Sequence, residues 1–166
     1  VTLGRTHWPD TNRVMLRNRR IGCSVSGVAQ FITKRGLGEF QNWLENGYDT
    51  IQEWDKQYSD WFAVPKSIKT TSVKPSGTVS LLAGATPGLH YPESRFYIRR
   101  VRLSKYSELI EPLKKANYKL EPAFGSEDTT MVVEVPVDVG EGIRTAAELS
   151  IWEQFSLAAF LQRHWA

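Results

Sequence analysis

The stretch that decides the fold of this chain is Ser72-Val73-Lys74-Pro75-Ser76-Gly77-Thr78-Val79-Ser80-Leu81-Leu82-Ala83-Gly84. Its pattern predicts a strand over 68–74, a tight polar turn, and a helix over 79–83. The first amides of a helix have no partner inside the helix, and the helix dipole places partial positive charge there, so phosphate is a natural ligand. Ser76 and Thr78 supply hydroxyls, and Gly77 lets a ligand approach the backbone closely. The alternative is an ordinary helix start in which a hydroxyl caps free amides.

Length and composition indicate a globular protein of about one domain. The chain has 166 residues, of which 41% are apolar and 23% charged. No stretch approaches the roughly 18 to 20 consecutive apolar residues of a membrane span, and the sequence opens with neither Met nor a signal-peptide layout. Cys23 is the single cysteine, which excludes an internal disulfide and fits a reducing compartment. We therefore expect an internal piece of a longer cytoplasmic protein, with no membrane partner.

The charge balance does not favour a nucleic-acid partner. Lys and Arg number 21 against 18 Asp and Glu, which gives a formal net charge of +3. Arginines cluster at 13–20 and 95–102, but no recognisable DNA- or RNA-binding signature accompanies them. Solvated faces or anion-holding positions explain these arginines, and we expect no nucleic-acid partner.

Outward from the central turn, the N-terminal side shows strand and helix patterns. Residues 20–25 are short and partly apolar, which predicts a buried strand, and 27–34 carry apolar residues at helical spacing. A further helix is predicted to open at Asp49, with Gln52 three positions on as in a capping box. Its apolar residues recur every three or four positions, and we expect them in the core: Ile51, Trp54, Tyr58 and Trp61.

The C-terminal side also alternates between extended and helical patterns. Residues 96–103 are predicted to be extended, and 107–117 to form a short helix that contains Pro112. Apolar and polar residues alternate over 131–137, where Pro136 indicates an edge strand.

A last helix is predicted from Thr145, which is followed by Glu148 in a capping-box pattern. Its apolar residues leave few polar sides: Leu149, Ile151, Trp152, Phe155, Leu157, Phe160 and Leu161. Such a helix requires burial on several faces, so we expect it to need partners beyond this chain. The alternation of strands and helices predicts an α/β fold, as part of a larger enzyme.

Four runs carry a family resemblance: THWPDTN over 6–12, RNRRIGCSVSG over 17–27, VKPSGTVSLLAG over 73–84 and TPGLHYP over 86–92. Together and in this order they resemble the adenosylcobalamin-dependent (class II) ribonucleotide reductases. The likeness is greatest to the monomeric ribonucleoside-triphosphate reductases, and it covers essentially the whole chain.

The resemblance implies a fold and an activity. The fold would be a ten-stranded α/β barrel of the kind shared by ribonucleotide reductases and glycyl-radical enzymes, incomplete in this chain. Residues 1–166 would form part of the C-terminal half of that barrel, with about 88–140 as a peripheral strand-helix-strand excursion. The activity would be reduction of ribonucleoside triphosphates to 2′-deoxyribonucleotides by a thiyl radical that adenosylcobalamin generates. Thioredoxin or a similar dithiol would be the reductant, and the parent would be a monomer.

The resemblance also assigns the central turn. Pro75, Ser76, Gly77 and Thr78 match the family loop that holds the substrate phosphates. Lys74 and Ser80 are secondary substrate-binding candidates, since Lys74 can simply face solvent and Ser80 can simply bond within its helix.

No catalytic residue is assigned in this chain. The family's radical cysteine lies in a finger loop that nothing here matches, so we interpret Cys23 as a small buried residue of a strand. The three histidines lie far apart in sequence, and we expect no metal site. The isolated chain is therefore expected to be inactive. Two alternatives stay open: a non-catalytic nucleotide-binding module, and a basic nucleic-acid-binding domain.

Overall fold

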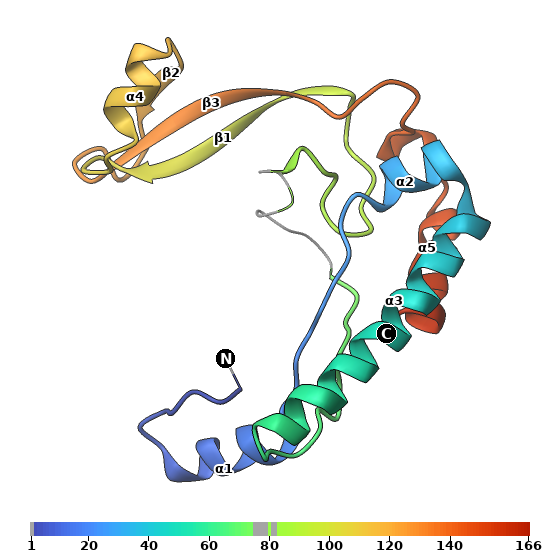
Figure 1. Cartoon of the computed structure of the whole chain (residues 1–166). Helices are drawn as coiled ribbons and strands as arrows, with labels where there is room; N and C mark the ends of the chain where they lie inside the picture. Colours follow the sequence, from blue (N-terminus) through green and yellow to red (C-terminus); the bar gives the residue numbers. More distant parts are fainter. Residues whose placement is uncertain (1, 75–79, 81–82) are drawn as a thin grey trace. The chain divides into compact units, whose positions relative to one another are not determined.

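The computed structural model describes residues 2–74, 80 and 83–166. The chain forms two compact units, which we call the helical unit (Val1–Glu93 with Gly142–Ala166) and the sheet unit (Ser94–Glu141). Figure 1 labels their helices and strands. The chain combines helices and strands, in agreement with the predicted α/β class, and none of its described helices is both long and apolar enough to cross a membrane.

The helical unit contains α1 (Pro9–Asn18), α2 (Val28–Arg35), α3 (Leu37–Trp61), the short 3-10 helix η2 (Ala146–Glu148) and α5 (Ile151–His164). The helix predicted over 27–34 is thus confirmed as α2. Figure 1 shows α5 beside the first half of α3. The core of this unit lies where α2, α3 and α5 meet, and its buried residues are Val28, Phe40, Leu44, Leu157, Leu161 and Trp165.

Helix α3 corrects one prediction, because it begins at Leu37 instead of Asp49. Gly36 separates α2 from α3 with a φ of 83°, a conformation that favours glycine. Beyond Gly36 no proline interrupts the helix, which continues for 25 residues. Asp49 and Gln52 therefore lie in the middle of α3, where their capping-box spacing has no capping role.

The aromatic stripe of α3 does not lie in the core, so that prediction is also wrong. Trp54, Tyr58 and Trp61 are 47%, 44% and 66% exposed, and only Ile51 packs partly against the core. The aromatic rings contact one another along the helix, with 5.3 Å between the Trp54 and Tyr58 centroids. The buried side of this part of α3 carries Asp55 instead.

The two strands predicted over 20–25 and 68–74 run side by side but form only one bridge, a parallel pairing of Cys23 with Thr71. Around it, the Cys23 amide donates to the Thr70 carbonyl and the Ser72 amide donates to the Cys23 carbonyl, both at 2.9 Å. The two predicted strands are therefore reduced to extended segments joined at a single bridge. Cys23 is exposed, contrary to the prediction of burial, although its backbone pairs with Thr71 and its carbonyl accepts from the Trp165 indole at 3.2 Å.

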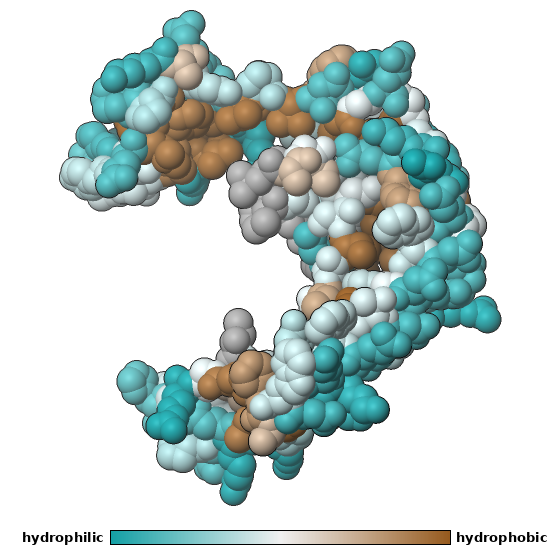
Figure 2. Space-filling model, viewed as in Figure 1, coloured by the Kyte–Doolittle hydropathy of each residue, from teal (hydrophilic) through white to brown (hydrophobic). Residues whose placement is uncertain are grey.

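The sheet unit contains β1 (Phe96–Ser104), α4 (Ile110–Lys115), β2 (Lys119–Pro122) and β3 (Thr130–Asp138). Its strands are antiparallel in the order β1-β3-β2, which confirms the predicted extended segments. Val133 is buried at the centre, opposite Val101 on one side and Leu120 on the other. Figure 2 shows apolar residues gathered over these strands.

Strand β3 is central, so the prediction of an edge strand is wrong for the strand as a whole. Pro136 nevertheless lies beyond the part of β3 that pairs with β2, and its ladder partner is Ile98 of β1. A residue without an N–H is tolerated there because one side of β3 has no strand neighbour at that position.

The helix predicted over 107–117 is shorter in the structure, where α4 has six residues and Pro112 lies in its first turn. Thr145 and Glu148 do form a capping box, but it opens the 3-10 helix η2. A second capping box, formed by Ser150 and Glu153, begins α5 five residues later than predicted. The predicted helix over 79–83 lies largely outside the described residues, and the ten-stranded barrel stays a prediction.

Candidate phosphate-binding site

The four residues assigned to phosphate, Pro75, Ser76, Gly77 and Thr78, lie outside the described residues. Their assignment therefore stays a prediction. The residues on either side of this turn, Lys74 and Ser80, are described, and so is the segment 84–88 that follows.

Lys74 follows the parallel pair formed around Cys23 and Thr71. Because parallel segments end at the same edge, the residues after each of them, Ser26 and Lys74, come together. The Lys74 ammonium donates to Ser26 Oγ at 2.6 Å. Lys74 is thus partly buried and held beside the start of α2, instead of simply facing solvent.

Segment 84–88 is attached to the start of α2 by three hydrogen bonds. The Gly27 amide donates to the Thr86 carbonyl at 2.8 Å. The Gln30 side chain donates to the Gly84 carbonyl at 3.0 Å and accepts from the Thr86 amide at 2.9 Å. The start of α2 therefore fixes the chain that leaves the predicted phosphate turn.

The same segment also touches the residue that enters the turn. Gly88 has a φ of +53°, and a Cβ added there would lie 2.5 Å from the Lys74 carbonyl oxygen. Only glycine allows this approach, because any other side chain would clash with the backbone of Lys74.

Ser80 is buried, at 6% exposure, and its carbonyl accepts from the Ala85 amide at 2.9 Å. Close by in sequence, Thr86 is 1% exposed, and its hydroxyl oxygen has no hydrogen-bond partner among the described residues. Burial of an unpaired hydroxyl costs free energy, and the hydroxyls of Ser24 and Thr71 are buried in the same way among the described residues.

Sequence reasoning missed the roles of Ser26, Gln30 and Thr86. Ser26 and Thr86 lie in two of the runs that carry the family resemblance, and this position in the sequence could have identified both residues as candidates. Gln30 lies outside those runs, and its partners are more than 50 residues away in sequence, so no local pattern identifies it.

The site is suited to binding an anion more than to moving protons. Within the described part of the chain, no three His, Cys, Asp or Glu side chains are grouped so as to hold a metal ion. Tyr91, in the TPGLHYP run, has a pKa raised by burial, and its phenol stays protonated at neutral pH. The described surroundings of the turn thus supply an ammonium group, hydroxyls and ordered backbone.

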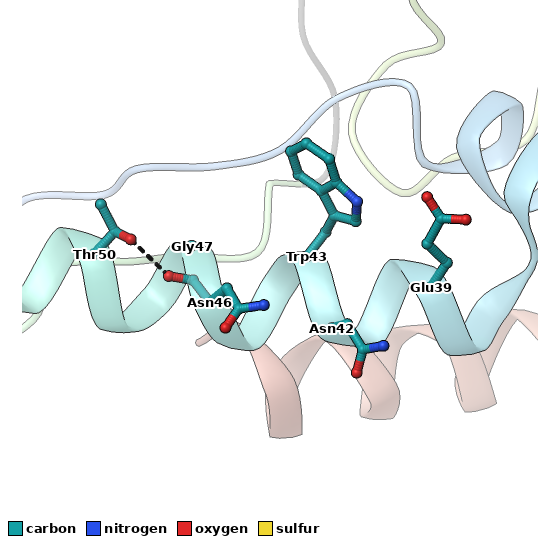
Figure 3. Close-up of a pocket in the computed structure, with 6 residues that line it drawn as sticks. All are labelled: Glu39, Asn42, Trp43, Asn46, Gly47 and Thr50. Carbon is teal, nitrogen blue, oxygen red and sulfur yellow. Dashed lines mark hydrogen bonds between the residues drawn. The ribbon is translucent and has the colours of Figure 1, made fainter.

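An open groove of about 550 Å³ lies along α3, away from these residues in sequence (Figure 3). It is lined by Glu39, Asn42, Trp43, Asn46, Gly47 and Thr50. One ionisable side chain, Glu39, is among them, and the Thr50 hydroxyl is already bonded to the Asn46 carbonyl at 2.8 Å. The groove brings together none of the predicted site residues.

Comparison with known proteins first gives the class. The fold is similar to the crystal structure of a B12-dependent (class II) ribonucleotide reductase, with a TM-score of 0.80 and 30% sequence identity. The match covers 99% of this chain and 27% of that structure. No protein-family model matches the chain.

Curated relatives then give a more particular likeness. The chain is 61% identical over 166 residues to a probable adenosylcobalamin-dependent ribonucleoside-triphosphate reductase of Dictyostelium discoideum. It is 58% identical to the adenosylcobalamin-dependent ribonucleoside-triphosphate reductase of Euglena gracilis, and 34% identical over 195 residues to that of Levilactobacillus brevis. All of this chain is matched, and it spans 22%, 23% and 26% of these relatives, about a quarter of their length. The resemblance inferred from the sequence is therefore confirmed: the chain corresponds over its full length to one segment of the adenosylcobalamin-dependent ribonucleotide reductases.

Proposed function

We propose that this chain is the part of an adenosylcobalamin-dependent ribonucleoside-triphosphate reductase that supplies barrel wall and the substrate phosphate-binding turn. The observation that carries the proposal is 61% identity over the entire chain to a relative with that named activity. The likeness of fold, at a TM-score of 0.80, supports it independently of the sequence runs. No observation favours the non-catalytic nucleotide-binding module.

The barrel and its periphery belong to this proposal. The parallel pairing of Cys23 with Thr71 supports two neighbouring strands of a larger sheet, which the rest of a ten-stranded barrel would complete. The compact sheet unit, Ser94–Glu141, supports a peripheral excursion in this part of the chain.

The substrate proposed for the turn is a ribonucleoside triphosphate, bound by Pro75, Ser76, Gly77 and Thr78. Lys74 adds a positive charge next to this turn, where Ser26 orients its ammonium group. Ser80 contributes as a buried residue that holds the chain after the turn. Hydroxyls and amides that fix the phosphates also fix the ribose relative to the reacting groups, which is how positioning lowers a barrier.

The cofactor of the proposed enzyme is adenosylcobalamin, which supplies the radical when bound, and the proposed reductant is thioredoxin or a similar dithiol. We assign none of the described residues to the cofactor. Cys23 is the single cysteine of the chain, and a redox pair needs two thiols. The chain alone is therefore proposed to be inactive, and the parent to be a cytoplasmic monomer.

The test is nucleoside-triphosphate reduction by the full-length protein that carries this segment, with adenosylcobalamin and a dithiol. Ser76→Ala combined with Thr78→Val removes two hydrogen bonds to a charged ligand, which predicts a rise in KM of about 100-fold or more. Ser156→Ala combined with Thr50→Val is the matched control, because it removes the same two hydroxyl types from exposed helix positions. Absence of deoxynucleotide formation by the wild type under every cobalamin condition would refute the proposal, and nucleotide binding by the chain alone would then be the next hypothesis.

A further inference from the structure

Gln30 is the residue that connects α2 to the chain following the phosphate turn. Its single side-chain amide makes two bonds of opposite sense to one short segment: it donates to the Gly84 carbonyl at 3.0 Å and accepts from the Thr86 amide at 2.9 Å. No carboxylate, hydroxyl or aliphatic side chain of similar length offers both a donor pair and an acceptor at one end. The geometry therefore selects glutamine.

The base of this connection is rigid. Val28 and Ala29, the two residues before Gln30 in α2, are fully buried. The Gly27 amide adds a third bond to the same segment, at 2.8 Å from the Thr86 carbonyl. Gln30 therefore acts from a fixed helix on a segment that is otherwise irregular.

The far end of the segment reaches the other side of the turn. Gly88 lies close to the Lys74 carbonyl, because a Cβ added to Gly88 would be 2.5 Å from the carbonyl oxygen of Lys74. Segment 84–88 thus contacts Gln30 at one end and the Lys74 backbone at the other, and Lys74 immediately precedes the turn. The Lys74 ammonium donates to Ser26, which lies just before α2, so that α2 contacts both segment 84–88 and Lys74.

We propose that Gln30 is a positioning residue for triphosphate binding, which acts through segment 84–88 and Lys74 without touching the substrate. The proposal rests on the proposed function, in that it assumes phosphate binding at the adjoining turn. It predicts that loss of the Gln30 bonds weakens substrate binding while the chemical step, which takes place on other residues, is preserved.

The decisive variant is Gln30→Met in the full-length protein, since Met keeps the length of the side chain and removes both hydrogen bonds. Two bonds of ordinary net strength correspond to roughly a thirtyfold change in an equilibrium, and the Gly27 bond retains part of the position. We expect the KM for a ribonucleoside triphosphate to rise about tenfold, with kcat within about twofold of wild type. The control is Gln41→Met, which removes an exposed amide bond of the same kind, to Glu45 within α3, and leaves KM unchanged.

Hydrogen exchange gives a readout that does not depend on turnover. The amide of Thr86 loses its acceptor in Gln30→Met, so exchange in a peptide covering 84–88 is expected to accelerate. Gln30→Glu keeps an acceptor for the Thr86 amide but loses the bond to the Gly84 carbonyl and adds a negative charge. It is expected to preserve slow exchange at Thr86 and to raise KM at least about threefold.

The outcomes separate the two proposals. If the wild type reduces no ribonucleotide, the proposed function fails, whatever the exchange data show. If the wild type is active and KM stays at the wild-type value in both Gln30 variants, the positioning role is overturned. A fall in kcat with KM unchanged would also overturn it. If Gln30→Met lowers the melting temperature more than Gln41→Met does, its raised KM no longer tests the positioning role. The KM of Gln30→Glu then tests that role instead.

Discussion

Replacement of Asp55 by alanine is predicted to destabilise the helical unit more than any surface substitution in α3. Asp55 is 8% exposed and lies opposite Arg19, which is 7% exposed, with 3.7 Å between Arg19 Nη2 and Asp55 Oδ1. The other carboxylate oxygen accepts from the Ser67 amide at 2.9 Å. Asp55 thus joins α3 to the end of α1 and to the chain that follows α3.

The magnitude follows from what the substitution leaves behind. Arg19 Nη1 keeps its bonds to Ser59 Oγ and the Pro65 carbonyl, both at 2.6 Å, so the guanidinium stays buried without its counter-charge. Removal of one partner from a buried ion pair costs about 3–5 kcal/mol. That loss lowers the ratio of folded to unfolded protein by roughly a hundredfold to several thousandfold.

The assay is urea unfolding followed by circular dichroism, with Asp49→Ala as the control because Asp49 is an exposed residue of the same helix. The control is expected to change the free energy of unfolding by less than about 0.5 kcal/mol. Arg19→Met combined with Asp55→Ala removes both charges, and its loss should be smaller than the sum of the two single losses. A loss below about 1 kcal/mol for Asp55→Ala, or strict additivity in the double variant, would refute this reasoning.

Three further predictions concern single residues. The Arg144 guanidinium lies 2.8 Å from Glu153 and is the main cause of a Glu153 pKa lowered from 4.5 to about 2. The contribution of ionised Glu153 to folding stability is therefore complete above pH 4.5 and is lost as the pH falls toward 2. Glu153→Gln should remove this contribution from the unfolding free energy measured as a function of pH. An unchanged pH dependence would contradict the role given to Glu153. Gly88→Ala should cost about 2–4 kcal/mol in unfolding free energy, because it adds a clash with the Lys74 carbonyl to a positive φ; a loss below 1 kcal/mol would mean that the loop yields. The exposed thiol of Cys23 should react with a thiol reagent in the native chain as fast as in urea, and strong protection would contradict its exposure.

Local pattern predicted the elements whose determinants are local. The alternation over 131–137 and the apolar spacing over 27–34 depend on neighbours in sequence, and both appear in the structure as β3 and α2. The start of α3 was mispredicted because Asp49 and Gln52 have capping-box spacing in the middle of a helix. Gly36 determines the true start through its backbone conformation.

Periodicity correctly placed Trp54, Tyr58 and Trp61 on one side of a helix but did not determine which side is buried. The buried side carries Asp55 and Ser59. Those polar residues are buried because Arg19, some 40 residues earlier, pairs with both of them. A partner so distant in sequence cannot be found from the helical pattern, and the same holds for Gln30 at the candidate site.

Helix α5 has more large apolar residues than the fold of this chain buries. A surface helix has one apolar stripe, and α5 has one toward the core, formed by Leu157 and Leu161. It has further apolar residues outside that stripe, since Ile151, Trp152 and Phe155 are 63%, 75% and 60% exposed. Exposure of this much apolar surface costs free energy that burial against another part of a protein would recover. The pattern therefore agrees with the proposed function, in which the chain is one segment of a larger barrel and α5 contributes a surface to its packing as well as to the core of the helical unit.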